Sequence, residues 1–167
     1  MGFELVPIHD GITARVKAVL PNTPVFEDMP LDEISIPMDP KAQMIPYVVL
    51  RYGPIRKAYG TGEALAGVRH DNYFGTMDLM TVAPTGRMAR QMFDLLTDAL
   101  LGFDAGGGGS ISLEGAASNF VVSSNETRPT QLVCMVRLKF PVNGVSVGEA
   151  VAAGFGVAPF GQGDFGS

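Results

Sequence analysis

Residues Asp71–Phe103 carry the clearest structural signals in the chain, and their sequence is DNYFGTMDLMTVAPTGRMARQMFDLLTDALLGF. The first part of this segment, Tyr73 to Ala83, is rich in Thr, Val and aromatic residues and contains no proline, which predicts a β-strand. Pro84 ends the strand pattern, and apolar residues then recur every three to four positions, which predicts an amphipathic helix with one side against a core. The segment therefore predicts a strand that leads directly into a helix.

The predicted helix has signals at both ends. Thr85 can cap its N-terminus through the side-chain hydroxyl, and Gly102 followed by the apolar Phe103 suits a left-handed C-terminal cap. The apolar stripe that we expect to face the core consists of Met88, Ala89, Met92, Leu95, Leu96, Ala99 and Leu100.

Patterns on both sides of this segment predict further elements. Apolar residues at helical spacing from Pro7 to Leu20, closed by Pro21, predict an opening helix. The other predicted strands are Val25–Phe26, Tyr47–Tyr52, Ile111–Leu113, Phe120–Val122 and Gln131–Phe140. In the last of these, alternation places Cys134 on a buried face and Arg137 on the opposite one. We therefore expect an α+β fold, with a small, mostly antiparallel sheet packed by two amphipathic helices.

Proline and glycine interrupt the regular patterns in three places. Between Pro21 and Pro54 the chain holds seven of its twelve prolines, which predicts a long, extended loop that could lie across a neighbouring subunit. Glycines and charged residues in 56–72 predict a hairpin excursion or a surface loop. The glycine run in 104–110 predicts a flexible connector, either a natural loop or an engineered spacer.

The C-terminal part is expected to differ from the rest of the chain. Ser146 and Glu149 have capping-box spacing and predict a helix of one or two turns. Residues 154–167 are rich in Gly and Phe without a regular period, which predicts a flexible tail that is mobile or becomes ordered on a partner. We therefore divide the chain into a single α+β domain at 1–140 and a C-terminal extension at 141–167.

Composition and charge narrow the functional classes. A net charge of -5 disfavours broad binding to a phosphate backbone. There is neither a run of 18 apolar residues nor a basic-then-apolar N-terminus, so we expect no membrane span, no secretory signal and synthesis in a cytoplasm. Residues 18–40 contain five acidic residues and no Lys or Arg, whereas Arg51, Arg56 and Lys57 follow closely. This segregation suits complementary patches between copies as well as scattered solvated charge.

Residues that could carry chemistry form no recognised constellation in the sequence. His9 and His70 each precede an aspartate, but two such pairs lack the spacing of a metal site, so solvated surface pairs are expected. Cys134 is the single cysteine and is expected to be buried, which excludes an internal disulfide and argues against a nucleophile. Residues 60–64 begin like a dinucleotide-binding turn, but the third glycine is out of place. We predict no catalytic residue, no cofactor and no metal.

The order of the predicted elements is helix, short strand, long loop, strand, excursion, strand, helix, strand, strand. The residues that define it most clearly are Pro7–Leu20 with Pro21, Val25–Glu27, Pro46–Leu50 and the strand–helix pair Asn72–Leu101. This pattern resembles the tail terminator (tail completion) proteins of long-tailed bacteriophages, small α/β proteins that form a ring at the head-proximal end of the tail tube. The resemblance covers most of 7–140, and the Pro-rich acidic loop and the Gly-rich extension depart from the family's pattern.

The resemblance implies a structural, non-enzymatic function in a virion that is made in the host cytoplasm. A ring, six-fold in the family, would cap the growing tail tube, halt its polymerisation and present a surface to the head–tail connector. The implied partners are further copies of the chain (a cyclic homo-oligomer, a hexamer), the major tail tube protein and the head–tail connector protein. No membrane and no sequence-specific nucleic acid are implied, although DNA could pass through the lumen of the ring.

We hypothesise that oppositely charged residues of adjacent copies meet in such a ring. The candidate inter-subunit contacts are Asp32, Glu33 and Asp39 on one copy and Arg51, Arg56 or Lys57 on the next. Individual exposed ion pairs are weak, so an apolar seam must supply most of the affinity.

Two alternatives stay open from the sequence. The first is another virion component, such as a neck or connector protein or a tail tube subunit, and a tube subunit would polymerise into filaments on its own. The second is a small ligand-binding or enzymatic α/β domain with a cleft near 60–70, which nucleotides or divalent metals would stabilise against heat.

Overall fold

The computed structural model describes residues 5–31, 33–57, 64–65, 68–69, 73–114, 121–124 and 131–142, with the backbone alone for 64–65, 68–69 and 121–124. The elements in chain order are α1 (Leu5–Val19), β1 (Val25–Glu27), β2 (Tyr47–Tyr52), β3 (Arg56–Lys57), β4 (Ala64–Leu65), β5 (Val68–Arg69), β6 (Tyr73–Ala83), α2 (Gly86–Leu100), β7 (Ser112–Leu113), β8 (Val121–Ser124) and β9 (Gln131–Val142). The predicted α+β class, both predicted helices and the predicted main strands are confirmed.

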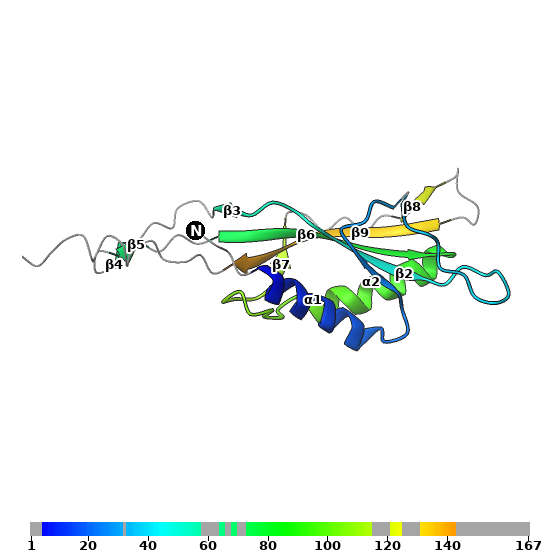
Figure 1. Cartoon of the computed structure of the whole chain (residues 1–167), viewed down its shortest axis with the longest axis horizontal. Helices are drawn as coiled ribbons and strands as arrows, with labels where there is room; N and C mark the ends of the chain where they lie inside the picture. The colour runs from blue at the N-terminus through cyan, green and yellow to red at the C-terminus, as the bar shows by residue number, and fades with distance from the viewer. Residues whose placement is uncertain are drawn as a thin grey trace, which may run out of the picture.

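A seven-stranded sheet forms one layer of the molecule (Figure 1). Its order is β1-β2-β6-β9-β7, while β3 also pairs with β6 and β8 also pairs with β9. The long strands β6 and β9 pair antiparallel along eleven residues each and form the centre of the sheet. The β1–β2 pair is the parallel one, and it needs the long connection 28–46 because a tight turn cannot join parallel strands.

Both helices lie on the same side of the sheet, which we call the helix face (Figure 1). Apolar residues one helical turn apart on α1, including Ile8, Ile12 and Val16, are buried there. They meet the inward-pointing half of the central strands, such as Leu79 and Leu138. The side chains that recur every 3.6 residues on the helices and every second residue on the strands therefore pack into one core.

The opposite side, which we call the loop face, has a second, smaller core under the Pro-rich connection. Ile34 and Met44 of the loop are buried against Tyr47, Val49 and other sheet residues that point away from the helices. The contact of the predicted long loop with a neighbouring subunit stays a prediction, while the loop places its own apolar residues on its own sheet. Burial of apolar area is a sufficient reason, because Ile34 and Met44 would otherwise be exposed to water.

The helix α2 has the predicted ends but a different buried stripe. The Thr85 hydroxyl accepts the Met88 backbone N–H at 3.3 Å, and Gly102 has a positive φ of 82° that suits a left-handed turn after the helix. Of the predicted stripe, Met88 and Leu95 are exposed, whereas Phe93, which the prediction left out, is buried. The helix is thus rotated slightly relative to the predicted orientation.

The glycine run in 104–110 is a packed loop, so the prediction of a flexible connector is corrected. The loop is closed by a bridge between Asp104 and Ser110 and by a hydrogen bond from the Gly106 N–H to the Asp104 carboxylate. Gly107 is buried against the β9 backbone, where a Cβ would lie 1.9 Å from the Pro141 carbonyl oxygen. Glycine is required at that position because no side chain fits.

The remaining expectations concern the periphery. The β4–β5 pair confirms a hairpin excursion between β3 and β6. The predicted turn at 60–64, of which only Ala64 is described, and the predicted helix and tail at 143–167 fall outside the described residues. No helix in the described part of the chain is both long enough and apolar enough to cross a membrane.

Candidate interaction surfaces

The half of the loop face that the Pro-rich loop leaves uncovered is charged. Strand alternation and register place Arg51, Asp78 and Arg137 in one row across β2, β6 and β9 on this face. One step further along the sheet, Lys139 lies over the Phe74 ring at 6.0 Å. We call this region, together with Arg56 of β3 and Glu114, the charged half. It holds four cationic and two acidic side chains in a chain whose net charge is -5.

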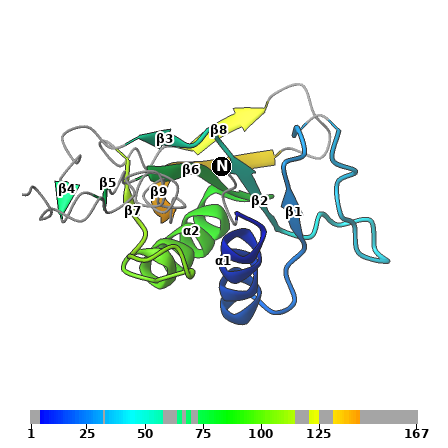
Figure 2. The same ribbon diagram turned by 60° about the vertical axis from the view of Figure 1, so that its left-hand side comes forward.

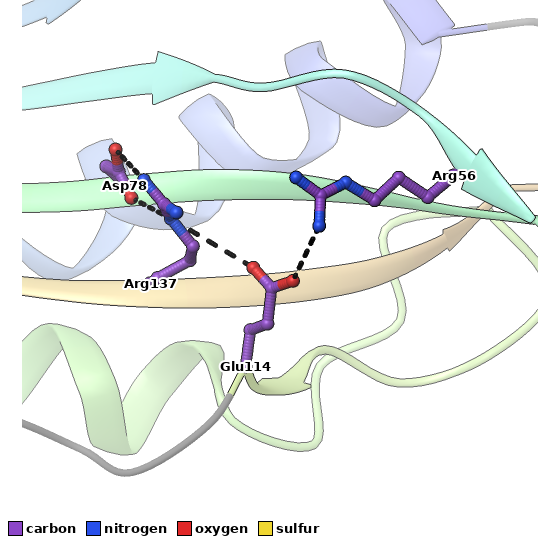
Figure 3. A network of polar contacts seen from close by, with 4 residues as sticks. All are labelled: Arg56, Asp78, Glu114 and Arg137. Carbon is purple, nitrogen blue, oxygen red and sulfur yellow. Dashed lines mark hydrogen bonds and ion pairs between the residues drawn. The ribbon is translucent and has the colours of Figure 1, made fainter. Parts of the chain in front are cut away.

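A network of ion pairs ties the charged half together (Figure 3). Arg137 donates to both carboxylate oxygens of Asp78, with Nε–Oδ1 at 2.7 Å and Nη2–Oδ2 at 3.0 Å. Glu114 lies between two arginines, at 3.9 Å from Arg56 and 4.0 Å from Arg137. The residues come from β3, β6, β9 and the end of β7, so the network links strands that are distant in sequence.

The electrostatics of the network follow from this geometry. The hydrogen bonds to Asp78 raise the pKa of the Arg137 guanidinium above its ordinary value, and the Asp78 and Glu114 charges act in the same direction. The Arg137 side chain is 55% exposed, so water screens these contacts. Glu114 Oε2 is buried without a hydrogen-bond partner, which leaves that carboxylate able to accept a further donor. No sequence signal could have identified this network, because Asp78 and Arg137 are 59 residues apart and meet only through the sheet register.

The predicted inter-subunit contacts are distributed over the two halves of the loop face. Glu33 is exposed in the covering loop, while Arg51 and Arg56 are exposed on the charged half. Arg56 faces Glu114 of its own chain, and Lys57 of β3 is also exposed. Asp32 is not among the described residues. The acidic and basic residues that are separated along the sequence therefore also lie on different halves of the loop face.

Asp39 has a role inside its own loop. Its carboxylate accepts the backbone N–H groups of Lys41 at 2.9 Å and Gln43 at 2.7 Å. The Asp39 N–H in turn donates to the Gln43 carbonyl, and Met38 and Met44 form an antiparallel bridge. Asp39 thus closes a small hairpin that holds Met44 against the sheet.

His9 is part of a packed cluster in which α1 meets Tyr52 of β2 and Phe140 of β9, so the expectation of a solvated surface pair is corrected. Its ring stacks on Tyr52 with centroids 3.6 Å apart and an angle of 10° between the planes. Burial lowers the pKa of His9, and Asp28, Glu27 and Asp10 oppose that shift in part. Burial raises the pKa of Tyr52 well above its ordinary value. His70 lies outside the described residues.

Cys134 is buried in β9 on the helix face, as predicted. Burial raises the pKa of its thiol, so the thiolate that nucleophilic chemistry requires is disfavoured. The described residues contain no group of three or more His, Cys, Asp or Glu side chains close enough to hold a metal ion.

The two edges of the sheet, here also called its ends, are further candidate surfaces. β1 is the terminal strand at one end, beside α1 (Figure 2), and β7 and β8 form the other end. The β1 end is acidic, since Glu27 and Asp28 are both exposed there and Met29 next to them is 37% exposed. Sheet ends carry backbone groups without a ladder partner and are therefore natural sites for pairing with another chain.

Comparison with known proteins gives structural similarities but no sequence match. No family model matches the sequence, and no curated protein matches it. A chain from the virion of a native gene transfer agent (GTA) particle is similar over 86% of this chain and 96% of that chain, with 14% sequence identity and a TM-score of 0.49. A second solved chain is similar over 86% of this chain and 99% of that chain, with 18% identity and a TM-score of 0.46. Similarities at this level assign neither a family nor a function.

Proposed function

We propose that the protein is a structural component of a phage-type virion, and more specifically a tail terminator that forms a ring at the head-proximal end of the tail tube. The proposal starts from the sequence resemblance to tail terminator proteins. The folded chain keeps the order of elements on which that resemblance depends, from α1 through β1 and β2 to the β6–α2 unit.

The observation that supports ring formation most directly is that, among the described strands, the sheet has two different edges, β1 at one and β7 with β8 at the other. A ring requires heterologous contacts, in which two different patches of one subunit meet the complementary patches of its two neighbours. β1 at one end and β7 with β8 at the other provide two such patches. A self-complementary patch, which a two-fold dimer would need, is not required by this arrangement.

The proposed mechanism is steric. A closed ring bound to the last layer of the tube would occupy the surface that the next tube subunit needs, so elongation would stop without any covalent step. The face of the ring away from the tube would then meet the connector. The partners in this proposal are other copies of the chain, the tail tube protein and the head–tail connector protein.

The experiment that tests this function is assembly with a purified tail tube protein. Native mass spectrometry and negative-stain imaging of the full chain are expected to give closed rings of one size, and addition of the rings is expected to stop tube growth at one end. Free filaments of the chain alone would instead identify a tube subunit. A chain that stays monomeric alone and in the presence of tubes would overturn the proposal.

Charge pairing between copies is a second, narrower part of the proposal. Reversal of Arg51 to Glu should weaken the ring at low salt if the cationic residues of one copy meet Glu33 and its neighbours on the next. Arg51 is preferable to Arg56 for this test, because Arg56 also contacts Glu114 within the chain. The matched control is Lys17→Glu, an exposed position on α1 away from the loop face. Equal ring stability in both variants would refute the pairing and leave the ring itself untouched.

A further inference from the structure

The backbone of β1 has hydrogen-bonding groups that point away from the sheet. The Pro24 carbonyl accepts the Val48 N–H at 2.9 Å, and the Asp28 N–H donates to the Leu50 carbonyl at 2.8 Å. In a parallel ladder alternate residues of one strand bond to the partner, so Phe26 also faces β2. The N–H and C=O groups of Val25 and Glu27 therefore point outward, and within the described part of the chain β1 has a strand on one side only.

The opposite end of the sheet presents a strand of suitable direction. The pairings β1–β2 parallel, β2–β6 antiparallel and β6–β9 antiparallel make β9 run in the same direction as β1. β8 pairs antiparallel with β9, so it runs opposite to β1. The two strands coincide at one level of the sheet, where Val25, Val48, Thr81, Cys134 and Val121 form a continuous row of register partners. From that row β1 and β8 extend in opposite directions, so pairing of their full lengths requires the next copy to be shifted along the strand direction.

We propose that β1 of one copy pairs with the outer edge of β8 of the next copy, so that the sheet continues from subunit to subunit. This inference rests on the proposed ring and names the contact that closes it. If neighbouring copies keep the same sheet orientation, β1 and β8 meet antiparallel, which is the more stable of the two strand pairings. Their lengths also match, with three residues in β1 and four in β8.

Charge supports a second copy as the occupant of the β1 edge. Glu27 of β1 and Asp28 next to it are both exposed. α2 contacts β8, and its first turns expose Arg87 and Arg90. Pairing of the two edges would bring acidic side chains of one copy toward arginines of the next, whereas two β1 edges would place like charges together.

The same features limit where else β1 can pair. Asp28 has a positive φ of 52° and ends the strand after three residues, and short, charged edge strands resist indiscriminate aggregation. So short a strand gives few backbone hydrogen bonds. Selectivity for β8 must therefore come from the flanking charges and from the geometry of the ring.

Photo-cross-linking of the full chain tests this contact. A benzophenone amino acid is placed at Met29, which is exposed beside β1, or at the exposed Val6 on α1 as the matched control. Labelled and unlabelled chains are mixed so that mass spectrometry identifies links between copies. We expect the Met29 probe to link to the peptide that contains Val121–Ser124 of another copy, and the Val6 probe to link elsewhere.

A proline substitution gives an independent measurement. Val25→Pro removes an outward N–H without removing a bond to β2, and proline is tolerated on sheet edges. The subunit dissociation constant is expected to rise about fivefold per interface, the equivalent of one hydrogen bond. Val25→Ala, which keeps the N–H, is expected to change it less.

The outcomes separate this inference from the proposed function. Closed rings whose Met29 links fall outside 121–124 would overturn the β1–β8 pairing while the terminator proposal stands. Equal dissociation constants for Val25→Pro and Val25→Ala would also overturn the pairing. A chain that never assembles, alone or with tail tubes, would overturn both.

Discussion

The helix face and the loop face of the same sheet are built in different ways. The helix face joins 19 buried residues, from two helices, three strands and Ile111 just before β7, into one core, whereas the core of the loop face contains six. The helix face is covered by regular elements whose own backbone bonds are internal. The loop face is covered by a Pro-rich segment held by a few turns and by the Asp39 hairpin. Stability therefore resides mainly on the helix face, and the loop face is the side on which a local rearrangement costs least.

The largest effect is expected from a cavity on the helix face. Leu96 is fully buried on α2, so Leu96→Ala removes apolar contacts and leaves a cavity in the core. The helix layer and the sheet layer are regular and cannot easily move together to fill it. We expect a loss of about 3 kcal/mol in the free energy of unfolding, measured by urea denaturation. The adjacent Leu95 is 55% exposed and serves as the control, since Leu95→Ala should change stability by less than about 0.5 kcal/mol. Equal losses for the two variants would contradict the described orientation of α2.

A smaller and more local effect is expected on the loop face. Met44→Ala removes a buried side chain from the covering loop, and the loop can partly close the resulting cavity. We expect a loss of about 1–2 kcal/mol, together with faster amide exchange in 33–46 than in β6. Met38, its partner across the same hairpin, is 43% exposed, so Met38→Ala is the control and should leave both quantities nearly unchanged. Uniformly faster exchange throughout the sheet would show that the two faces unfold together.

Sequence reasoning succeeded where a period was present. β9 was predicted from alternation and α2 from helical spacing, each over ten or more residues, and Thr85 and Gly102 mark the helix ends. β6 was predicted from its composition, which is rich in Thr, Val and aromatic residues. The prediction that Met88 and Leu95 are buried was wrong, because amphipathic spacing does not determine which of two adjacent apolar rows of the helix faces the sheet.

The loop-face core and the charged half could not be predicted in the same way. Ile34 and Met44 are separated by prolines and share no period, so only the folded path of the loop reveals that they lie on the sheet. The network of Asp78, Glu114 and Arg137 depends on strand register, which the sequence did not specify. The packing of the glycine loop against Pro141 is likewise a tertiary contact without a local signal.

The ion pairs of the charged half are expected to contribute little to stability. Arg137→Ala removes the two hydrogen bonds to Asp78, but the arginine is more than half exposed, so we expect a loss of about 0.5–1 kcal/mol. A double-mutant cycle with Asp78→Asn measures the coupling, and Arg51→Ala in the same row is the control. A coupling well above 1 kcal/mol would mean that the uncovered half of the loop face is stabilised more strongly than its exposure indicates.

The smallest effect concerns His9, the titratable group at the rim of the helix face. Because burial lowers the pKa of His9 in the folded protein, the unfolded chain, with a pKa near 6.5, takes up the proton first as the pH falls. The free energy of unfolding should therefore decrease as the pH falls below about 6.5, until the lowered folded-state pKa is reached. His9→Phe keeps an aromatic ring against Tyr52 without titrating, so its stability should change less between pH 7.5 and pH 5. If the carboxylates of Asp10, Glu27 and Asp28 outweighed burial, His9 would instead stabilise the fold on protonation. The sign of the difference between the two proteins thus decides whether His9 holds α1 to β2 and β9 mainly by packing or by charge.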